Sequence, residues 1–239
     1  MKIGALLMLS LLSVLGAAAG PWKPQSINTE AVRVLLITGG HDHDVEFYSA
    51  FDDPKIKTIV DPHPAAFSGD IRRRADVLVL YDMVKTLDNQ KRKNLRDFVE
   101  SGKGVVILHH AICNNTDWPW WYEEVVGGRY LFEPVNGKQS SYRHDVEQAI
   151  TMAMDHPITR GVGSFRILDE TYKDLWISPR VKVLLRSDHP LSDGPVMWIG
   201  PSEKSRVVYL QLGHDHHAHL NPKFQQLVRT SIQWAAGKK

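Results

Sequence analysis

Histidine is concentrated in three short segments of this chain, which has 239 residues and twelve histidines. Residues 213–219, with the sequence GHDHHAH, hold four of them, and residues 39–44 (GGHDHD) and 108–111 (LHHA) hold two each. Imidazole changes its charge near neutral pH and is a common ligand of divalent metals. Segments of this kind therefore predict either acid/base catalysis or a metal site.

The metal hypothesis rests on the His-x-His spacing found in two of these segments. Alternate side chains of an extended backbone point to the same side, so two such pairs could supply a tetrahedral site that keeps a position open for water. The expected ligands, with zinc as the candidate ion, are His41, His43, His214 and His216.

The acid/base hypothesis centres on His109, which directly follows an apolar run and is expected at the end of a buried strand. A neutral imidazole near an oriented carboxylate titrates close to a working pH, so we pair His109 with His214 and place Asp215 beside them. A third interpretation is a polar loop whose histidines bond backbone groups or are solvated. It accounts for His217 and His219 but poorly for His109.

Each histidine segment follows a run that is typical of a strand. Between Thr86 and Gly102 the apolar residues instead follow a helical period, with Thr86 as the expected N-cap. Short apolar strands that alternate with amphipathic crossovers predict an α/β fold, with a mainly parallel central sheet covered on both faces. Loops that leave the carboxyl ends of parallel strands meet over one edge, so one cleft should collect the histidines. The expected strands of this half are residues 31–38, 57–60, 76–81 and 104–108.

The second half of the chain is less regular. Its strand candidates follow one another closely, which suggests antiparallel additions to the sheet. A helix over residues 221–236 is expected to end the domain, and since no linker interrupts the pattern we expect one domain over residues 31–237. The candidate strands are near residues 141–146, 165–168, 181–185, 196–199 and 207–212.

Aromatic and acidic residues near these loops are further candidates. Trp120 and Trp121 lie shortly after His109 and His110 and could stack on the apolar face of a sugar ring, or equally form a packed hydrophobic lid. Glu170 could be a general acid or base if it faces the cleft, with the phenol of Tyr172 nearby; the alternative is an ordinary surface acid. Cys113 is interpreted as a small buried side chain, because His109 occupies the position of a nucleophile after the strand.

The N-terminal segment matches the three regions of a secretory signal peptide. Lys2 is followed by an apolar run over residues 3–15 and by small residues 16–20. We expect cleavage near Ala19, a leader over residues 20–30, and a periplasmic or extracellular protein. A membrane anchor is the weaker alternative, because a spanning helix needs roughly 20 apolar residues.

Composition restricts the class of partner. Without Lys2, 28 basic residues (29 − 1) face 27 acidic ones, so electrostatics give no case for nucleic acid or an anionic membrane as a partner. The single cysteine excludes an internal disulfide. No G-x-S-x-G elbow, phosphate-binding loop or G-x-G-x-x-G fingerprint occurs, which argues against serine hydrolases, P-loop proteins and Rossmann enzymes.

Several motifs occur in order along the chain, at residues 34–41, 102–109, Trp120 with 127–128, 156–161, 169–172, 195–198, 206–209, 212–215 and 234–235. Together they resemble the ThuA-like family, which is named for trehalose utilisation. The resemblance implies a flavodoxin-like three-layer sandwich related to class I glutamine amidotransferases. It also implies that His109 stands where those enzymes carry a nucleophilic cysteine, and that His214 stands where their last loop brings a histidine. An amidotransferase reaction is therefore not expected, and the association is with disaccharide catabolism, including routes through 3-keto sugars.

Together these observations predict an exported enzyme that acts on a glycoside or a 3-keto sugar by hydrolysis, elimination or isomerisation. The partner would be a small carbohydrate, and a homo-oligomer is left open. A non-catalytic sugar-binding protein and a metal-dependent hydrolase of another substrate are the alternatives. The expected catalytic residues are His109, His214, Asp215 and Glu170, and the expected substrate-binding residues are His41, His43, His110, Trp120, Trp121 and Tyr172.

Overall fold

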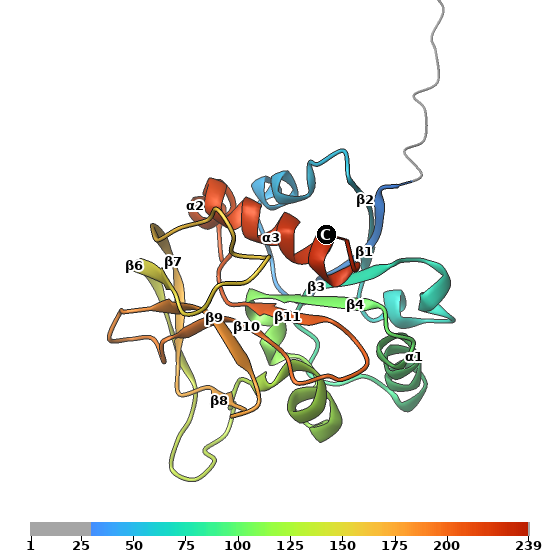
Figure 1. The fold of residues 1–239 in the computed structure, drawn as a ribbon. Helices are drawn as coiled ribbons and strands as arrows, with labels where there is room; N and C mark the ends of the chain where they lie inside the picture. The colour runs from blue at the N-terminus through green and yellow to red at the C-terminus, as the bar shows by residue number, and fades with distance from the viewer. Residues whose placement is uncertain (1–29, 239) are drawn as a thin grey trace, which may run out of the picture.

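A nine-stranded mixed sheet runs through the computed structural model, which describes residues 30–238 (Figure 1). The predicted signal peptide and residues 20–29 of the predicted leader lie outside this range. The strand order of the sheet is β2-β1-β3-β4-β11-β10-β9-β6-β7. The strands are β1 (Val32–Gly39), β2 (Ile56–Pro62), β3 (Val77–Asp82), β4 (Gly104–Leu108), β6 (Ser141–Met152), β7 (Phe165–Lys173), β9 (Lys182–Ser187), β10 (Pro195–Ile199) and β11 (Val207–Leu210).

The parallel half of the sheet consists of β2, β1, β3, β4 and β11. Every residue of β3, β4 and β11 is buried, which is why these strands appear in the sequence as continuous apolar runs. Along β1, Val34 and Leu36 enter one hydrophobic core while Leu35 and Ile37 enter another. Two cores separated by one sheet make the predicted three layers.

Helices and short turns cover both faces. The helix α3 (Pro222–Ala235) and the turn η1 (Val45–Phe51) pack on one face, and α1 (Asn89–Glu100) and the π-helical turn η5 (Trp120–Val126) pack on the other (Figure 1). The expected helix over residues 221–236 is confirmed. The crossovers from β1 to β2 and from β2 to β3 contain only the 3₁₀ turns η1, η2 (Ala65–Phe67) and η3 (Ile71–Arg73), so the amphipathic crossovers expected here are not α-helices.

The start of α1 also differs from the prediction. Asp88 is its N-cap, because the Asp88 carboxylate accepts a hydrogen bond from the backbone N–H of Lys91 at 2.9 Å. The Thr86 hydroxyl instead donates to Asp117 at 3.0 Å.

The antiparallel half of the sheet curves back towards the parallel half. β10, β9, β6 and β7 pair antiparallel with one another, as their spacing predicted, and β10 joins them to β11. Three strands separate β7 from β11 in the sheet, yet Asp169 of β7 accepts a hydrogen bond from the backbone of Gly213, just beyond β11, at 2.8 Å. The edge strand β7 therefore lies over the carboxyl ends of the parallel strands.

Small elements complete the fold. They are the 3₁₀ turn η4 (His109–Cys113), the short helix α2 (His216–His219), and a two-stranded ribbon of β5 (Gly128–Arg129) and β8 (Trp176–Ile177). Within residues 30–238, no helix is long and apolar enough to cross a membrane.

Candidate functional site

The three histidine segments meet at the carboxyl edge of the parallel strands. His41 follows β1, His109 follows β4 and His214 follows β11. The imidazole centroids of His41 and His214 lie 5.9 Å apart, and those of His109 and His214 lie 5.2 Å apart. The loop before His214 depends on Gly213, whose φ is +114° and whose Cβ, if it had one, would lie 2.6 Å from the Phe224 ring.

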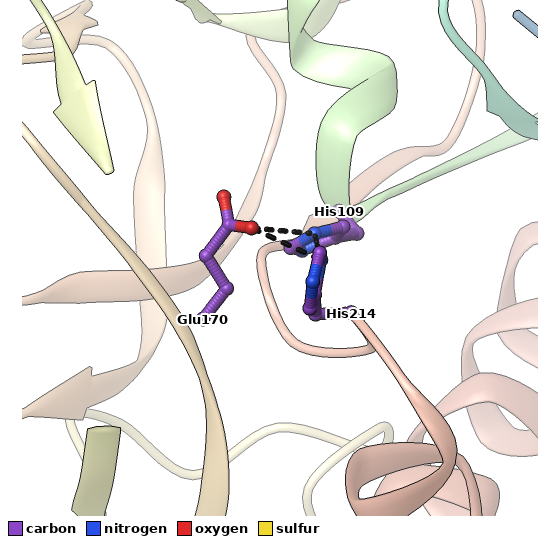
Figure 2. Close-up of side chains that lie close together, drawn as sticks. All are labelled: His109, Glu170 and His214. Carbon is purple, nitrogen blue, oxygen red and sulfur yellow. Dashed lines mark hydrogen bonds and ion pairs between the residues drawn. The ribbon is translucent and has the colours of Figure 1, made fainter. Parts of the chain in front are cut away.

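A buried carboxylate completes this group. Glu170 of β7 is 5% exposed, and its Oε2 lies 3.0 Å from His214 Nδ1 and 3.9 Å from His109 Nε2. The two imidazole nitrogens are 3.2 Å apart. Figure 2 shows Glu170 reaching from β7 towards the two rings. We call His109, His214 and Glu170 the imidazole–carboxylate cluster.

The tautomer of His109 follows from its surroundings. Its Nδ1 lies 2.6 Å from the backbone carbonyl of Gln211, which can only accept, so Nδ1 carries the proton. Burial holds the pKa of His109 well below its usual value, so the ring is neutral. Its Nε2 lone pair therefore faces Glu170 and His214, and the Tyr172 hydroxyl is 3.2 Å from the same nitrogen.

His109 also has an unusual backbone conformation. Its φ is +49°, in the left-handed region that residues with a side chain rarely adopt. The residue occupies the sharp turn straight after β4, which aims its imidazole into the carboxyl edge of the sheet. Strain at such a position is commonly associated with function.

The pKa of His214 is shifted in the opposite direction from that of His109. Burial lowers the pKa of His214, but the hydrogen bond and the charge of Glu170 outweigh it, and the net result is a raised pKa. When protonated, His214 forms an ion pair with the Glu170 carboxylate, whose Oε2 lies 3.0 Å from His214 Nδ1.

Asp169 fixes the relative position of β7 and the His214 loop. Its carboxylate is 3% exposed and accepts three backbone hydrogen bonds, from Gly213 at 2.8 Å, His214 at 3.0 Å and Glu170 at 2.8 Å. Burial raises the pKa of Asp169 to about 7, against these hydrogen bonds, which lower it. The strand expected near residues 165–168 is longer than predicted, since β7 ends at Lys173, so the 169–172 motif lies within the strand.

His144 joins the cluster, although no sequence motif singled it out. Its Nδ1 lies 3.2 Å from Glu170 Oε2, and its ring centroid lies 4.5 Å from that of His214. The pairing of β6 with β7 shifts register between Arg143 and Val146, and Asp145 has a φ of +55°. This bulge directs His144 towards the cluster, as bulges beside active sites often do.

The cluster opens into a cavity of about 440 Å³, which we call the cleft. Ligand sites typically measure about 300–1,000 Å³. His110 lines its floor with 3% exposure, and neither ring nitrogen has a hydrogen-bond partner among the described residues. Burial lowers the pKa of His110 to about 3. The lining residues also include His41, Met83, Cys113, Tyr130, Phe132, Gln139, Ser140, Tyr142 and Tyr172.

Two expected substrate-binding residues lie elsewhere. Trp121 is 1% exposed and belongs to the hydrophobic core on the α1 side of the sheet. Trp120 packs under the Arg96 guanidinium, 4.3 Å from its ring centroid. Both side chains face α1, so the platform expected from them is absent from the cleft, whose aromatic walls are Tyr130, Phe132 and Tyr142.

The expected metal set is likewise not gathered. His43 Nε2 lies 3.0 Å from the Tyr48 hydroxyl, and exposed His216 faces Asp44. Asp215 caps α2 by accepting from the backbone of His217 and is not part of the cluster. Within residues 30–238, the sets of ligand atoms close enough for an ion are His109–Glu170–His214 and the more exposed Asp215–His216–His217.

Two other residues are buried beside the site. His219 is 0% exposed and its Nε2 lies 3.0 Å from the Gly213 carbonyl, so it supports the loop. Cys113 borders the cleft at 6% exposure, and burial raises the pKa of its thiol to about 12. A thiol of that pKa is a poor nucleophile at neutral pH, consistent with the interpretation of Cys113 as a buried side chain.

Comparisons with known proteins agree with this architecture. The family model described as "ThuA: Trehalose utilisation" matches residues 19–235, whereas no curated protein matches the sequence. A ThuA-like protein from Parabacteroides merdae has a TM-score of 0.75 at 19% identity, covering 87% of this chain and 91% of its own. A ThuA-like protein from Bacteroides uniformis has a TM-score of 0.63 at 20% identity, covering 92% and 95%. A β-galactosidase from Bacillus circulans sp. alkalophilus matches with a TM-score of 0.58 at 15% identity, over 88% of this chain and 32% of its own.

Proposed function

The chain belongs to the ThuA family, and we propose that it is a carbohydrate-processing enzyme whose active site is the cleft above the imidazole–carboxylate cluster. One observation carries the proposal. Nitrogen atoms of His109 and His214 and an oxygen of Glu170 lie within 4.8 Å of one another, and His109 and Glu170 line a cavity of about 440 Å³. Such convergence of buried polar groups in a cleft is characteristic of active sites.

The walls of the cleft suit a sugar. Tyr130, Phe132 and Tyr142 offer ring faces to the apolar face of a pyranose, and Gln139 and Ser140 offer polar groups to its hydroxyls. His110 lines the same cavity, and within residues 30–238 neither of its ring nitrogens has a hydrogen-bond partner. The family description, trehalose utilisation, adds support for a carbohydrate as the substrate.

The proposed substrates are glycosides or their 3-keto derivatives. A keto group acidifies the neighbouring C–H bond, so a positioned base can remove that proton during elimination or isomerisation, whereas an unmodified sugar resists. His109, His214 and Glu170 would act at the reacting atoms, because their ring nitrogens and carboxylate oxygen lie within 4.8 Å of one another. His41 and His110 would hold hydroxyls beside these atoms.

We also propose that the protein acts after export, with a small carbohydrate as its partner. The support is the charged, apolar and small-residue pattern of residues 2–20. Fusion of this segment to a reporter enzyme that works only outside the cytoplasm tests export without reference to catalysis.

Turnover and binding, measured separately, test the enzyme proposal. His109→Ala and His214→Ala should lower turnover of glycosides or 3-keto glycosides by at least about 10²-fold, the usual contribution of a catalytic proton-transfer group. Calorimetric affinity for the same sugars should change only a few-fold. His217→Ala is the matched control, because this exposed imidazole bonds Asp215 outside the cleft. A wild-type protein that binds these sugars but converts none of them would be a sugar-binding protein and not an enzyme.

A further inference from the structure

The geometry points to a divalent transition-metal site formed by His109 Nε2, His214 Nδ1 and Glu170 Oε2, with zinc as the best-fitting ion. The inference deepens the proposed function and rests on it for taking the cleft as the active site. It also replaces the ligand set predicted from the His-x-His spacing, of which only His214 remains.

The separations between the ligand atoms fit a single ion. Zinc bonds to imidazole nitrogen and carboxylate oxygen at about 2.0–2.1 Å, and a tetrahedron of such bonds has edges of about 3.3–3.4 Å. The three edges here are 3.0 Å (His214 to Glu170), 3.2 Å (His109 to His214) and 3.9 Å (His109 to Glu170). Shifts of about half an ångström would bring all three atoms onto one zinc ion.

The surroundings hold these ligands in the orientation that a metal requires. Metal-binding histidines usually donate their second ring N–H to a carbonyl or a carboxylate, which fixes the tautomer. His109 does this through Nδ1 and the Gln211 carbonyl, and so presents the Nε2 electron pair. His214 is held through its backbone N–H by Asp169, which also binds the backbone of Glu170.

A second observation supports the metal site, because three imidazole nitrogens lie near the same carboxylate oxygen. Imidazole nitrogens of His214 and His144 lie 3.0 and 3.2 Å from Glu170 Oε2, and His109 Nε2 lies 3.9 Å from it. His144 is 49% exposed, so this imidazole lies on the solvent side of the cluster.

The donor set selects among metals. Two imidazoles and one carboxylate, with a position open to the cleft, match catalytic zinc sites and non-haem iron(II) sites, whereas magnesium and calcium prefer oxygen ligands alone. An ion held there would polarise a substrate oxygen in the cleft. His109 and His214 would then act through the ion, and His144 would be the nearest imidazole left for proton transfer.

Zinc titration of chelator-stripped, full-length protein tests the site without any sugar. We expect one high-affinity zinc per chain by calorimetry, and a loss of affinity of at least about 10²-fold in His214→Ala and Glu170→Gln, since removal of even an outer-sphere partner costs about 10–100-fold. Glu170→Gln keeps the shape of the side chain, and circular dichroism confirms that each variant is folded. His217→Ala disrupts the other candidate group and should bind zinc as the wild type does.

Each other outcome decides the question. The inference is overturned if the wild-type protein binds no zinc stoichiometrically. It is also overturned if the affinity for zinc falls in His217→Ala but not in Glu170→Gln, because that result would place the ion at the exposed group of Asp215, His216 and His217. Stripped protein that still turns over sugars overturns the metal site and leaves the proposed function intact. Stoichiometric zinc binding at the cluster, without turnover of any sugar, overturns the proposed function and leaves the metal site intact.

Discussion

Replacement of Asp169 by Asn should both destabilise the fold and misplace the imidazole–carboxylate cluster. Oδ1 of Asp169 accepts from the backbone of His214 and Glu170, and Oδ2 accepts from the backbone of Gly213. Asparagine has one acceptor oxygen, so it can keep at most two of these bonds, and its NH₂ group would face the N–H of Gly213.

The magnitude follows from the bond that is lost. A typical hydrogen bond contributes about 0.5–1.5 kcal/mol to stability, and an unsatisfied buried donor costs about 1–3 kcal/mol. We expect Asp169→Asn to lower the free energy of unfolding by about 2–4 kcal/mol. For a domain of this size that corresponds to a fall in Tm of about 4–16 °C.

Thermal and urea unfolding measure the effect on stability. Asp52→Asn is the matched control, because Asp52 is exposed, and its change should stay within about 0.5 kcal/mol. Turnover should fall too, since a displacement of about 1 Å at a reacting group can cost about 10²-fold. An Asp169→Asn protein as stable as the control would refute the assignment of Asp169 as the residue that joins β7 to the His214 loop.

Two further predictions concern the cleft and the adjacent end of β3. Tyr142 lines the cleft, so Tyr142→Ala should weaken sugar binding by about tenfold, the scale of one lost aromatic contact. Trp120 packs against Arg96 instead, so Trp120→Ala should leave sugar binding unchanged. Equal losses of affinity in a calorimetric titration of the two variants would contradict the placement of these rings. Asp82 raises the pKa of His63, whose Nδ1 lies 3.3 Å from Asp82 Oδ2. The stability due to His63 is therefore fully present below its unfolded pKa of about 6.5 and is lost as pH rises through the raised folded value. His63→Gln should therefore destabilise the protein more at about pH 5.5 than at about pH 8.5 in urea unfolding, and a loss that is larger at the higher pH would reverse this assignment.

The parallel half of the fold was predictable because each of its central strands can be recognised from its own residues. A strand buried on both faces is apolar at nearly every position, so β3, apart from its last residue Asp82, stands out in the sequence with β4 and β11. The histidine loops then follow from a general rule on the carboxyl ends of parallel strands.

The curvature of the antiparallel half could not be predicted in this way. It depends on twist accumulated over several strands, which no single segment records. It brings Glu170 of β7 to His109 and His214, and a register shift in β6 brings His144. The sequence alone therefore left Glu170 undecided between a cleft and a surface position, and did not identify His144.

The errors at other positions also have physical reasons. Nearness in sequence suggested that Trp121 would lie at the cleft, but large aromatic rings are as useful in a core, and Trp121 is 1% exposed. His-x-His spacing places two rings on one side only in extended backbone. Residues 216–219 instead form α2, so His216 points away from the cluster.

The return of β7 over β4 and β11 has a consequence for how the protein folds. His109 contacts His214 across 105 residues and Tyr172 across 63 residues of chain. Contacts of such sequence separation form slowly, because a long loop must close before any of them stabilises the structure. A chain emerging from the ribosome can pair β1, β3 and β4 long before the cleft exists, so the ability to bind a ligand there should be the last property gained on folding.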